Sequence, residues 1–160
     1  MSLYRQALWI VENYETLGQG HDWRVEDVRW TWIESVDRVA KGLKPFTQVH
    51  PEFECEEHEI DYEDYYQRLQ KLIKSIRGIP SVRGLDLWVY TPPPTNRFFA
   101  PSVLYGRPEH YQAFLDASDN PFTLESQALY GLVFGYPEEK IAAFLIRWKQ
   151  MQLKADSDMA

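Results

Sequence analysis

Residues 61–90, DYEDYYQRLQKLIKSIRGIPSVRGLDLWVY, change from helical to strand periodicity and decide the fold class of this chain. In the first half, apolar side chains recur at the spacing that places them on one face of a helix. This apolar stripe comprises Tyr62, Tyr65, Tyr66, Leu69, Leu72, Ile73 and Ile76. Asp61 stands where an N-cap is expected, and Gly78 ends the pattern. In residues 85–90, LDLWVY, aliphatic side chains alternate with Asp, Trp and Tyr, which predicts a strand. The stretch therefore indicates a mixed fold of helices and strands.

The segment after this strand predicts a β-hairpin followed by three helices. Residues 97–105 have strand character, and the proline-rich tip at 91–95 ends the first strand because proline cannot donate a ladder hydrogen bond. Helical spacing then recurs in residues 106–117, in residues 124–134 and from Pro137 onward. A Gly-Tyr-Pro turn separates the last two helices, since glycine favours the end of a helix and proline the start of one.

The segment before residue 61 predicts two helices and an extended stretch. Residues 3–17 show helical spacing and end at a glycine-containing turn. Asp22 is the expected N-cap of a second helix, which runs to residue 43. Residues 46–60 alternate instead, and Pro51 limits them to an edge strand or to two short strands.

The order of these elements predicts a single α+β domain over residues 1–154, in which helices cover a small antiparallel sheet. A chain of 160 residues is long enough to bury a core and most often forms one domain. The alternative is a mainly α fold with an inserted hairpin. Residues 155–160 end the chain and are expected to fray.

Charge is concentrated in one segment, residues 50–64, which reads HPEFECEEHEIDYED. This segment contains eight of the 24 acidic residues and no Lys or Arg, so it accounts for the net charge of −7. Acids at this density repel one another unless cations compensate them, and they attract basic partners. We therefore expect a basic protein or a nucleic-acid-binding protein as partner. Direct binding to nucleic acid is not expected, because it requires a basic surface.

The predicted function is that of a non-catalytic adaptor or regulatory domain that presents an acidic, aromatic-flanked surface to this partner. Aromatic residues make up 15% of the chain, and Tyr and Trp are enriched at the cores of protein interfaces. The expected partner-binding residues are Glu54, Glu56, Glu57, Glu59, Trp88 and Tyr90. The sequence has no phosphate-binding glycine loop, GxSxG elbow or HExxH motif, so catalytic activity is not expected.

The alternative function is that of a metal-dependent enzyme with a histidine and carboxylate site within residues 50–58. Imidazole and carboxylate groups bind divalent transition metals. The expected ligands, which would share one face of an extended strand, are His50, Glu52, Glu54 and His58. One strand rarely supplies a complete site, so His21 or His110 would have to contribute. No cofactor is expected if the protein is not an enzyme. A third possible function is the binding of a small molecule in an aromatic pocket.

The single cysteine of the chain, Cys55, excludes an internal disulfide and indicates a reducing compartment. The N-terminus lacks a basic region followed by an unbroken apolar run, which is the pattern of a signal peptide. No apolar run approaches the length of a membrane span. We therefore expect a cytoplasmic protein that has no membrane partner.

Overall fold

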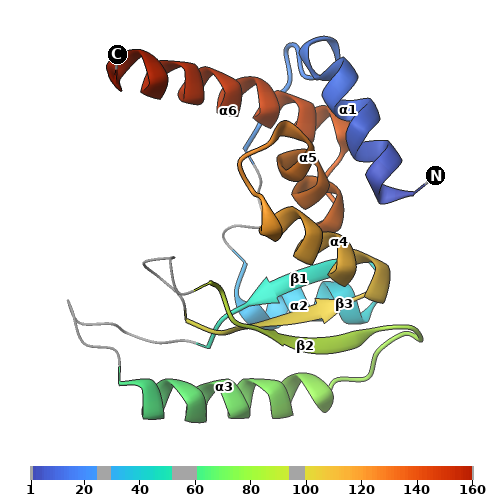
Figure 1. Ribbon diagram of the computed structural model, residues 1–160. Coiled ribbons are helices and arrows are strands. Elements are labelled where there is room, and N and C mark those ends of the chain that lie inside the picture. Colours follow the sequence, from blue (N-terminus) through green and yellow to red (C-terminus); the bar gives the residue numbers. More distant parts are fainter. Residues whose placement is uncertain (1, 25–29, 52–60, 94–99, 160) are drawn as a thin grey trace. The chain divides into compact units, whose positions relative to one another are not determined.

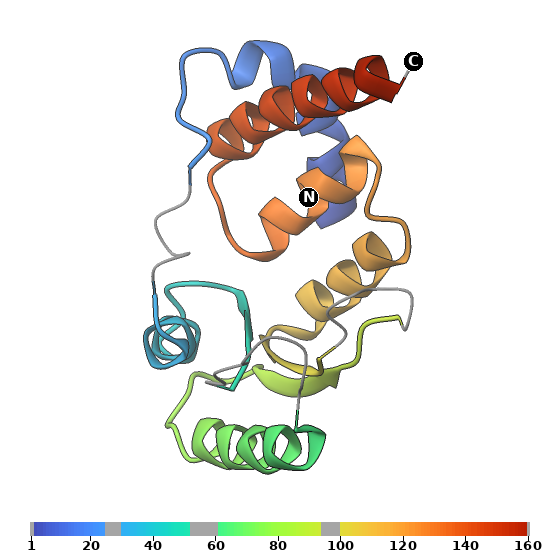
Figure 2. The ribbon, with the colours of Figure 1, turned by 90° about the vertical axis from the view of Figure 1, so that its left-hand side faces the viewer.

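The computed structural model describes residues 2–24, 30–51, 61–93 and 100–159, which fall into two compact units (Figures 1 and 2). The helical unit consists of Met1–Val28 and Glu109–Ala160, and the sheet unit consists of Arg29–Pro108. The chain therefore begins and ends in the helical unit, and the sheet unit is built from its middle.

In the helical unit, the N-terminal segment of the chain packs against the C-terminal segment. Its described helices are α1 (Leu3–Leu17), α4 (Pro108–Asp119), α5 (Leu124–Val133) and α6 (Glu138–Met159). α1 packs against both α5 and α6. Gly18 permits this approach, because a Cβ atom there would lie 2.4 Å from the backbone nitrogen of Ala143 in α6. A larger residue would push the end of α1 away from α6.

Aromatic side chains join α4 to α5 within the helical unit. The ring of Phe114 meets those of Tyr130 and Phe134 edge to face, with centroids 5.7 and 6.2 Å apart. The Tyr130 hydroxyl donates a hydrogen bond to Oγ of Ser118 at 2.8 Å. Ring packing and a satisfied hydroxyl therefore hold these two helices together.

The sheet unit contains a three-stranded antiparallel sheet and two described helices. Its elements are α2 (Trp32–Ala40), β1 (Phe46–Val49), α3 (Tyr62–Arg77), β2 (Asp86–Tyr90) and β3 (Ser102–Gly106). β3 is the central strand, and β1 and β2 form the two edges. α2 and α3 pack against the same face of the sheet, because both contribute to one buried cluster with β1 and β3 (Figure 1).

The strand register assigns each residue to one of the two sheet faces. Val103 pairs with Val49 on one side and with Val89 on the other, so these three share the face toward the helices. Leu104 pairs with Trp88 and lies on the opposite face. The buried cluster between the helices and the sheet consists of Val36, Val39, Ala40, Val49, Leu69, Leu72, Ile73, Ile76, Val103 and Tyr105.

The predicted fold class and the order of the elements are confirmed. The chain is α+β, with a small antiparallel sheet that helices cover on one face. α3 begins at the expected cap, because the Asp61 side chain accepts a hydrogen bond from the backbone nitrogen of Asp64 at 3.2 Å. β2 and β3 pair with each other as the predicted hairpin strands. Residues 94–99, at the expected hairpin tip and the start of its second strand, lie outside the described ranges.

The prediction that Asp22 starts the second helix is wrong. Oδ1 of Asp22 accepts a hydrogen bond from the backbone nitrogen of Arg24 at 3.0 Å, within a non-helical segment. The N-cap of α2 is Thr31, whose Oγ1 accepts a hydrogen bond from the backbone nitrogen of Glu34 at 3.3 Å. Thr31 and Glu34 have the spacing of a capping box, which is a stronger start signal than one aspartate. Residues 25–29, also predicted to be helical, lie outside the described part of the chain.

The extended stretch expected over residues 46–60 is described only at its beginning. β1 covers Phe46–Val49 at a sheet edge, and His50 and Pro51 follow it outside the strand. Residues 52–60 lie outside the described ranges. Their predicted alternation therefore stays a prediction.

The C-terminal helix is longer than the sequence pattern indicates. α6 continues to Met159, although fraying was expected from residue 155. The boundaries of the predicted domain, 1–154, stay a prediction. None of the described helices is long and apolar enough to cross a membrane.

Candidate functional site

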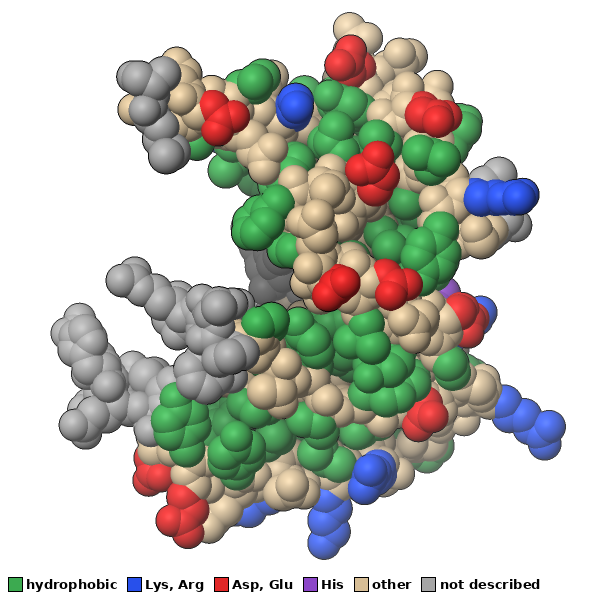
Figure 3. Space-filling view, in the orientation of Figure 1, with side chains coloured by type: hydrophobic (Ala, Val, Ile, Leu, Met, Phe, Trp, Pro, Cys, Tyr) green, Lys and Arg blue, Asp and Glu red, His purple; other side chains and the backbone are tan. Residues whose placement is uncertain are grey.

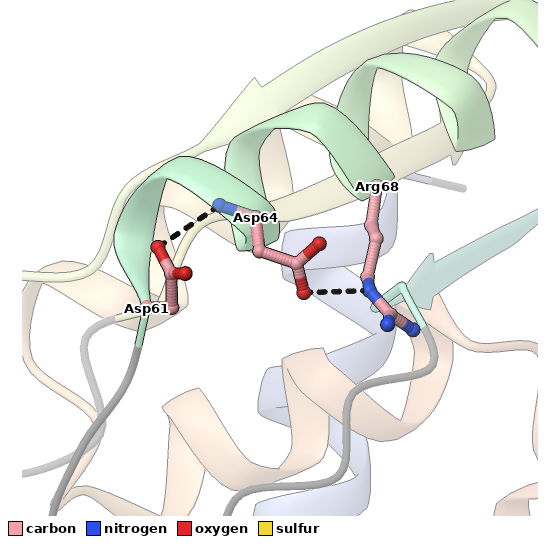
Figure 4. Close-up of polar contacts among 3 residues, drawn as sticks. All are labelled: Asp61, Asp64 and Arg68. Carbon is pink, nitrogen blue, oxygen red and sulfur yellow. Dashed lines mark hydrogen bonds and ion pairs between the residues drawn. The ribbon is translucent and has the colours of Figure 1, made fainter.

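The last four residues of the acidic segment, 61–64, lie at the start of α3. Asp61 caps the helix, and Oδ2 of Asp64 accepts a hydrogen bond from Nε of Arg68 at 2.9 Å, which is also an ion pair (Figure 4). Glu63 and Asp64 lie in the first helical turn, where the positive end of the helix dipole favours carboxylates. These acids therefore stabilise the helix that carries them.

Within the described part of the chain, the negative charge of this turn is only partly neutralised. Asp64 and Arg68 form a half-exposed pair, which contributes less than about 1 kcal/mol to stability. Asp61 and Glu63 are exposed, and no cationic nitrogen of a described residue lies within 4.0 Å of their carboxylates. The described residues therefore leave a negative potential at the start of α3.

Two of the three tyrosines at the start of α3 are exposed, although all three belong to the predicted apolar stripe. Tyr65 is 4% exposed, and its hydroxyl donates a hydrogen bond to the Pro101 carbonyl. Tyr62 and Tyr66 are 45% and 48% exposed. They stand four residues apart at the edge of the stripe, on one flank of the helix. The stripe is wider than the face that packs against the sheet, so these two rings remain at the surface.

The α3 surface is defined here as Asp61, Tyr62, Glu63 and Tyr66. It combines two exposed rings with two exposed carboxylates within little more than one helical turn. Figure 3 shows acidic side chains at the end of the sheet unit where α3 begins, next to hydrophobic side chains, and basic side chains farther along the helix. Charge is thus segregated along α3, with acids at its start and Lys74 and Arg77 in its last turn.

Trp88 and Tyr90, the two aromatics predicted to bind a partner, lie away from this surface. Both are partly buried and lie on the sheet face opposite to α3. The Trp88 ring packs near Phe46, with centroids 6.5 Å apart. The predicted partner-binding acids Glu54, Glu56, Glu57 and Glu59 lie outside the described residues. The exposed aromatics beside the described acids are therefore Tyr62 and Tyr66.

Of the four predicted metal ligands, only His50 lies in the described part of the chain. Its side chain keeps a large exposed fraction, yet desolvation by the atoms around it lowers its pKa below the ordinary value. The remaining ligands, Glu52, Glu54 and His58, lie outside the described ranges, and His21 and His110 belong to the helical unit. Among the described residues, no group of three His, Cys, Asp or Glu side chains could hold a metal ion.

The helical unit contains a cavity of about 330 Å³ between the end of α5 and the start of α6. We call it the α5–α6 pocket. It is lined by Trp23, Gln127, Tyr130, Gly131, Phe134, Tyr136, Lys140, Ile141 and Phe144. Five of these nine residues are aromatic, and Lys140 carries the only full charge among the described lining residues.

The turn between α5 and α6 shapes this pocket. Gly135 adopts a φ of +80°, and the Tyr136 backbone nitrogen donates to the Gly131 carbonyl at 3.0 Å, which closes the end of α5. A Cβ atom on Gly131 would lie 2.6 Å from Cγ1 of Ile141, so glycine allows α6 to approach α5 closely. Lys140 follows in the first turn of α6, and its Nζ donates to the Arg24 carbonyl at 2.9 Å.

Sequence reasoning named an aromatic pocket as an option but missed its residues. The Gly-Tyr-Pro turn was the available signal, because it brings two aromatic-rich helices together. Trp23 could not be assigned to the pocket from local pattern, since it lies more than a hundred residues away in the chain. No protein family, curated protein or solved structure matches this chain.

Proposed function

We propose that this protein is a non-catalytic interaction domain that binds a basic segment of another protein through the α3 surface. The observation that carries the proposal is the pairing of exposed rings at Tyr62 and Tyr66 with exposed carboxylates at Asp61 and Glu63. No described cation neutralises these two carboxylates. A partner that supplies Lys or Arg would compensate the charge that the described residues leave unneutralised.

The two tyrosines supply the apolar part of such an interface. Tyrosine is enriched among the residues that dominate binding energy, because it buries a large ring and keeps a polar tip. The guanidinium of Arg or the ammonium of Lys also binds the face of an aromatic ring, with about 0.5–1 kcal/mol at an exposed site. A segment with basic residues around an apolar residue therefore fits the chemistry of this surface.

The rest of the acidic segment supports the same kind of partner. Residues 50–64 carry eight acids without Lys or Arg, and α3 begins inside this segment. A field of one sign raises the rate at which an oppositely charged partner arrives, and salt screens that effect. Binding through this region is therefore expected to weaken as ionic strength rises.

The test uses fluorescently labelled peptides in which Lys and Arg surround a central Leu, with anisotropy measured at low and at physiological salt. We expect binding that weakens with salt and falls roughly tenfold in the double variant Tyr62→Ser/Tyr66→Ser. The pair Asp61→Asn/Glu63→Gln should weaken binding and flatten its salt dependence. Replacing Glu54, Glu56, Glu57 and Glu59 by Gln should do the same without unfolding the protein.

Matched controls separate the α3 surface from a general effect of charge. The double variant Glu125→Gln/Glu139→Gln removes two acids from the first turns of α5 and α6, the same change in net charge as Asp61→Asn/Glu63→Gln. Phe122→Ser removes a ring that is 77% exposed in the helical unit. Both controls should bind like the wild type. Equal losses in the controls and the α3 variants, or binding that does not respond to salt, would contradict the proposal.

A further inference from the structure

We propose that the α5–α6 pocket binds a small, flat aromatic carboxylate. The pocket is concave, mainly apolar and provided with one cation, which are the features of small-molecule sites in proteins. This site lies within the helical unit and is independent of the proposed role of α3.

The volume of the cavity limits the size of the ligand. Ligand pockets commonly enclose about 300–1,000 Å³, and an apolar cavity of about 150 Å³ takes up benzene. A cavity of about 330 Å³ is therefore at the small end of this range and has room for two fused rings. Long acyl chains and nucleotides are too large to be enclosed.

The lining selects a planar, apolar body. Trp23, Tyr130, Phe134, Tyr136 and Phe144 present aromatic rings from three separate segments of the chain. The rings of Phe134 and Tyr136 lie 6.5 Å apart at an angle of 39°, which leaves them tilted rather than stacked on each other. Aromatic rings gain most from offset or edge-on contact with another ring, so a flat aromatic ligand matches these walls.

Lys140 selects the charge of the ligand. Of its three donor positions, one is directed to the Arg24 carbonyl at 2.9 Å, which holds the ammonium near Trp23 at the pocket. No Asp or Glu is among the described lining residues, although Glu138 and Glu139 precede Lys140 in the first turn of α6. A carboxylate on the ligand would accept from the remaining donors and form a charge-assisted hydrogen bond.

The experiment uses 2-naphthoate and its neutral counterpart 2-naphthamide, titrated into the full-length protein by calorimetry. We expect saturable binding of 2-naphthoate at one site and weaker binding of 2-naphthamide. Lys140→Gln should reduce the affinity for 2-naphthoate roughly tenfold and leave that for 2-naphthamide unchanged. Phe144→Ala should weaken both ligands, because it removes a ring from the wall.

The matched control is Lys149→Gln, which removes an exposed cation from α6 outside the pocket lining. It should bind both ligands like the wild type. Circular dichroism and amide NMR spectra of each variant establish that it is folded, and shifts at Gly131 and Tyr136 locate the bound ligand. Failure of the folded wild type to bind 2-naphthoate would overturn the proposal. Equal effects of Lys140→Gln and Lys149→Gln, or shifts confined to other residues, would overturn it as well.

Discussion

The α5–α6 pocket and the α3 surface place the same residue type, tyrosine, in opposite surroundings. In the pocket, Tyr130 and Tyr136 are two of five aromatic lining residues, and Lys140 is the one cation of the described lining. On the α3 surface, Tyr62 and Tyr66 are 45% and 48% exposed and lie beside two exposed carboxylates. Enclosed rings next to a cation favour a small anion. Exposed rings next to acids favour a larger, basic partner.

The comparison shows that aromatic content alone does not indicate a function in this chain. Six Trp, ten Tyr and eight Phe give the same composition whether a ring is buried, lines a cavity or remains exposed. What differs is the surrounding charge and the depth of burial. Variants at buried and at exposed positions therefore distinguish the rings and charges that stabilise the fold from those available for binding.

The largest effect is expected for Leu69→Ala, which removes a side chain that is 2% exposed in the cluster between α3 and the sheet. The cavity left behind should cost about 3 kcal/mol in the free energy of unfolding, measured by urea denaturation. Tyr66→Ala, one turn earlier and 48% exposed, should change the unfolding free energy by less than about 0.5 kcal/mol. A comparable loss for Tyr66→Ala would show that this ring serves the core instead of the α3 surface.

A smaller loss is expected for Gly18→Ala in the helical unit. The added Cβ would lie 2.4 Å from the backbone of Ala143, so α1 and α6 must separate, at a cost of about 2 kcal/mol. In the matched change Gly20→Ala, the added Cβ would meet no atom within 4 Å. Only the φ of +79° at this position opposes the substitution. It should cost about 1 kcal/mol in thermal unfolding. Equal values for the two variants would contradict the close packing of α1 on α6.

The cap of α3 provides a third test, because Asp61 has both a structural and a binding role. Asp61→Ala removes the acceptor for the Asp64 backbone nitrogen and should cost about 1 kcal/mol in the free energy of unfolding. Asp61→Asn keeps an acceptor and should cost much less, since asparagine is an equally good N-cap. Both variants lose the same charge, so they should weaken peptide binding equally. If Asp61→Ala weakened peptide binding more than Asp61→Asn, the loss would follow stability and not charge, which would contradict the role of the α3 surface.

Alkaline titration tests the contact between α1 and α4. Desolvation and the hydrogen bond that Tyr4 donates to Asp116 raise the pKa of Tyr4 from 10.0 to about 12. Tyr4 ionises at a lower pH in the unfolded chain than in the folded one. Its contribution to the free energy of unfolding is therefore complete below pH 10 and is lost as the pH rises to about 12. The difference in tyrosinate absorbance between the wild type and Tyr4→Phe should therefore show a step near pH 12. A step near pH 10 would contradict the hydrogen bond.

The smallest effect is expected from metal ions. If the protein is not a metal enzyme, its melting temperature should be the same with a chelator and with Mg, Ca, Mn, Fe(II), Co, Ni or Zn. A metal that binds only the folded chain would add about 2.7 kcal/mol at a hundredfold excess over its dissociation constant. If one metal raised the melting temperature and the double variant His50→Ala/His58→Ala lost this rise, the result would favour the metal-dependent enzyme over the interaction domain.

Local chemistry predicted the order of the helices and strands of this protein, but not all of their boundaries. The cap at Asp61, the stop at Gly78 and the stripe between them depend on neighbours within one or two helical turns, so α3 could be placed from the sequence. The helix at α2 shows the limit of this approach. Asp22 and Thr31 both belong to the residue types that favour an N-cap, but Thr31 also has Glu34 three residues later, the spacing of a capping box.

The tertiary structure decided which of these side chains face solvent and which enclose a cavity. Periodicity placed Tyr62, Tyr65 and Tyr66 in one stripe, but the contact with the sheet buries only Tyr65. Trp23 reaches the pocket only because the start and the end of the chain pack into one unit. Local spacing determines which side chains share one face of a helix. Whether that face is buried depends on atoms from distant parts of the sequence, so only long-range packing decides it.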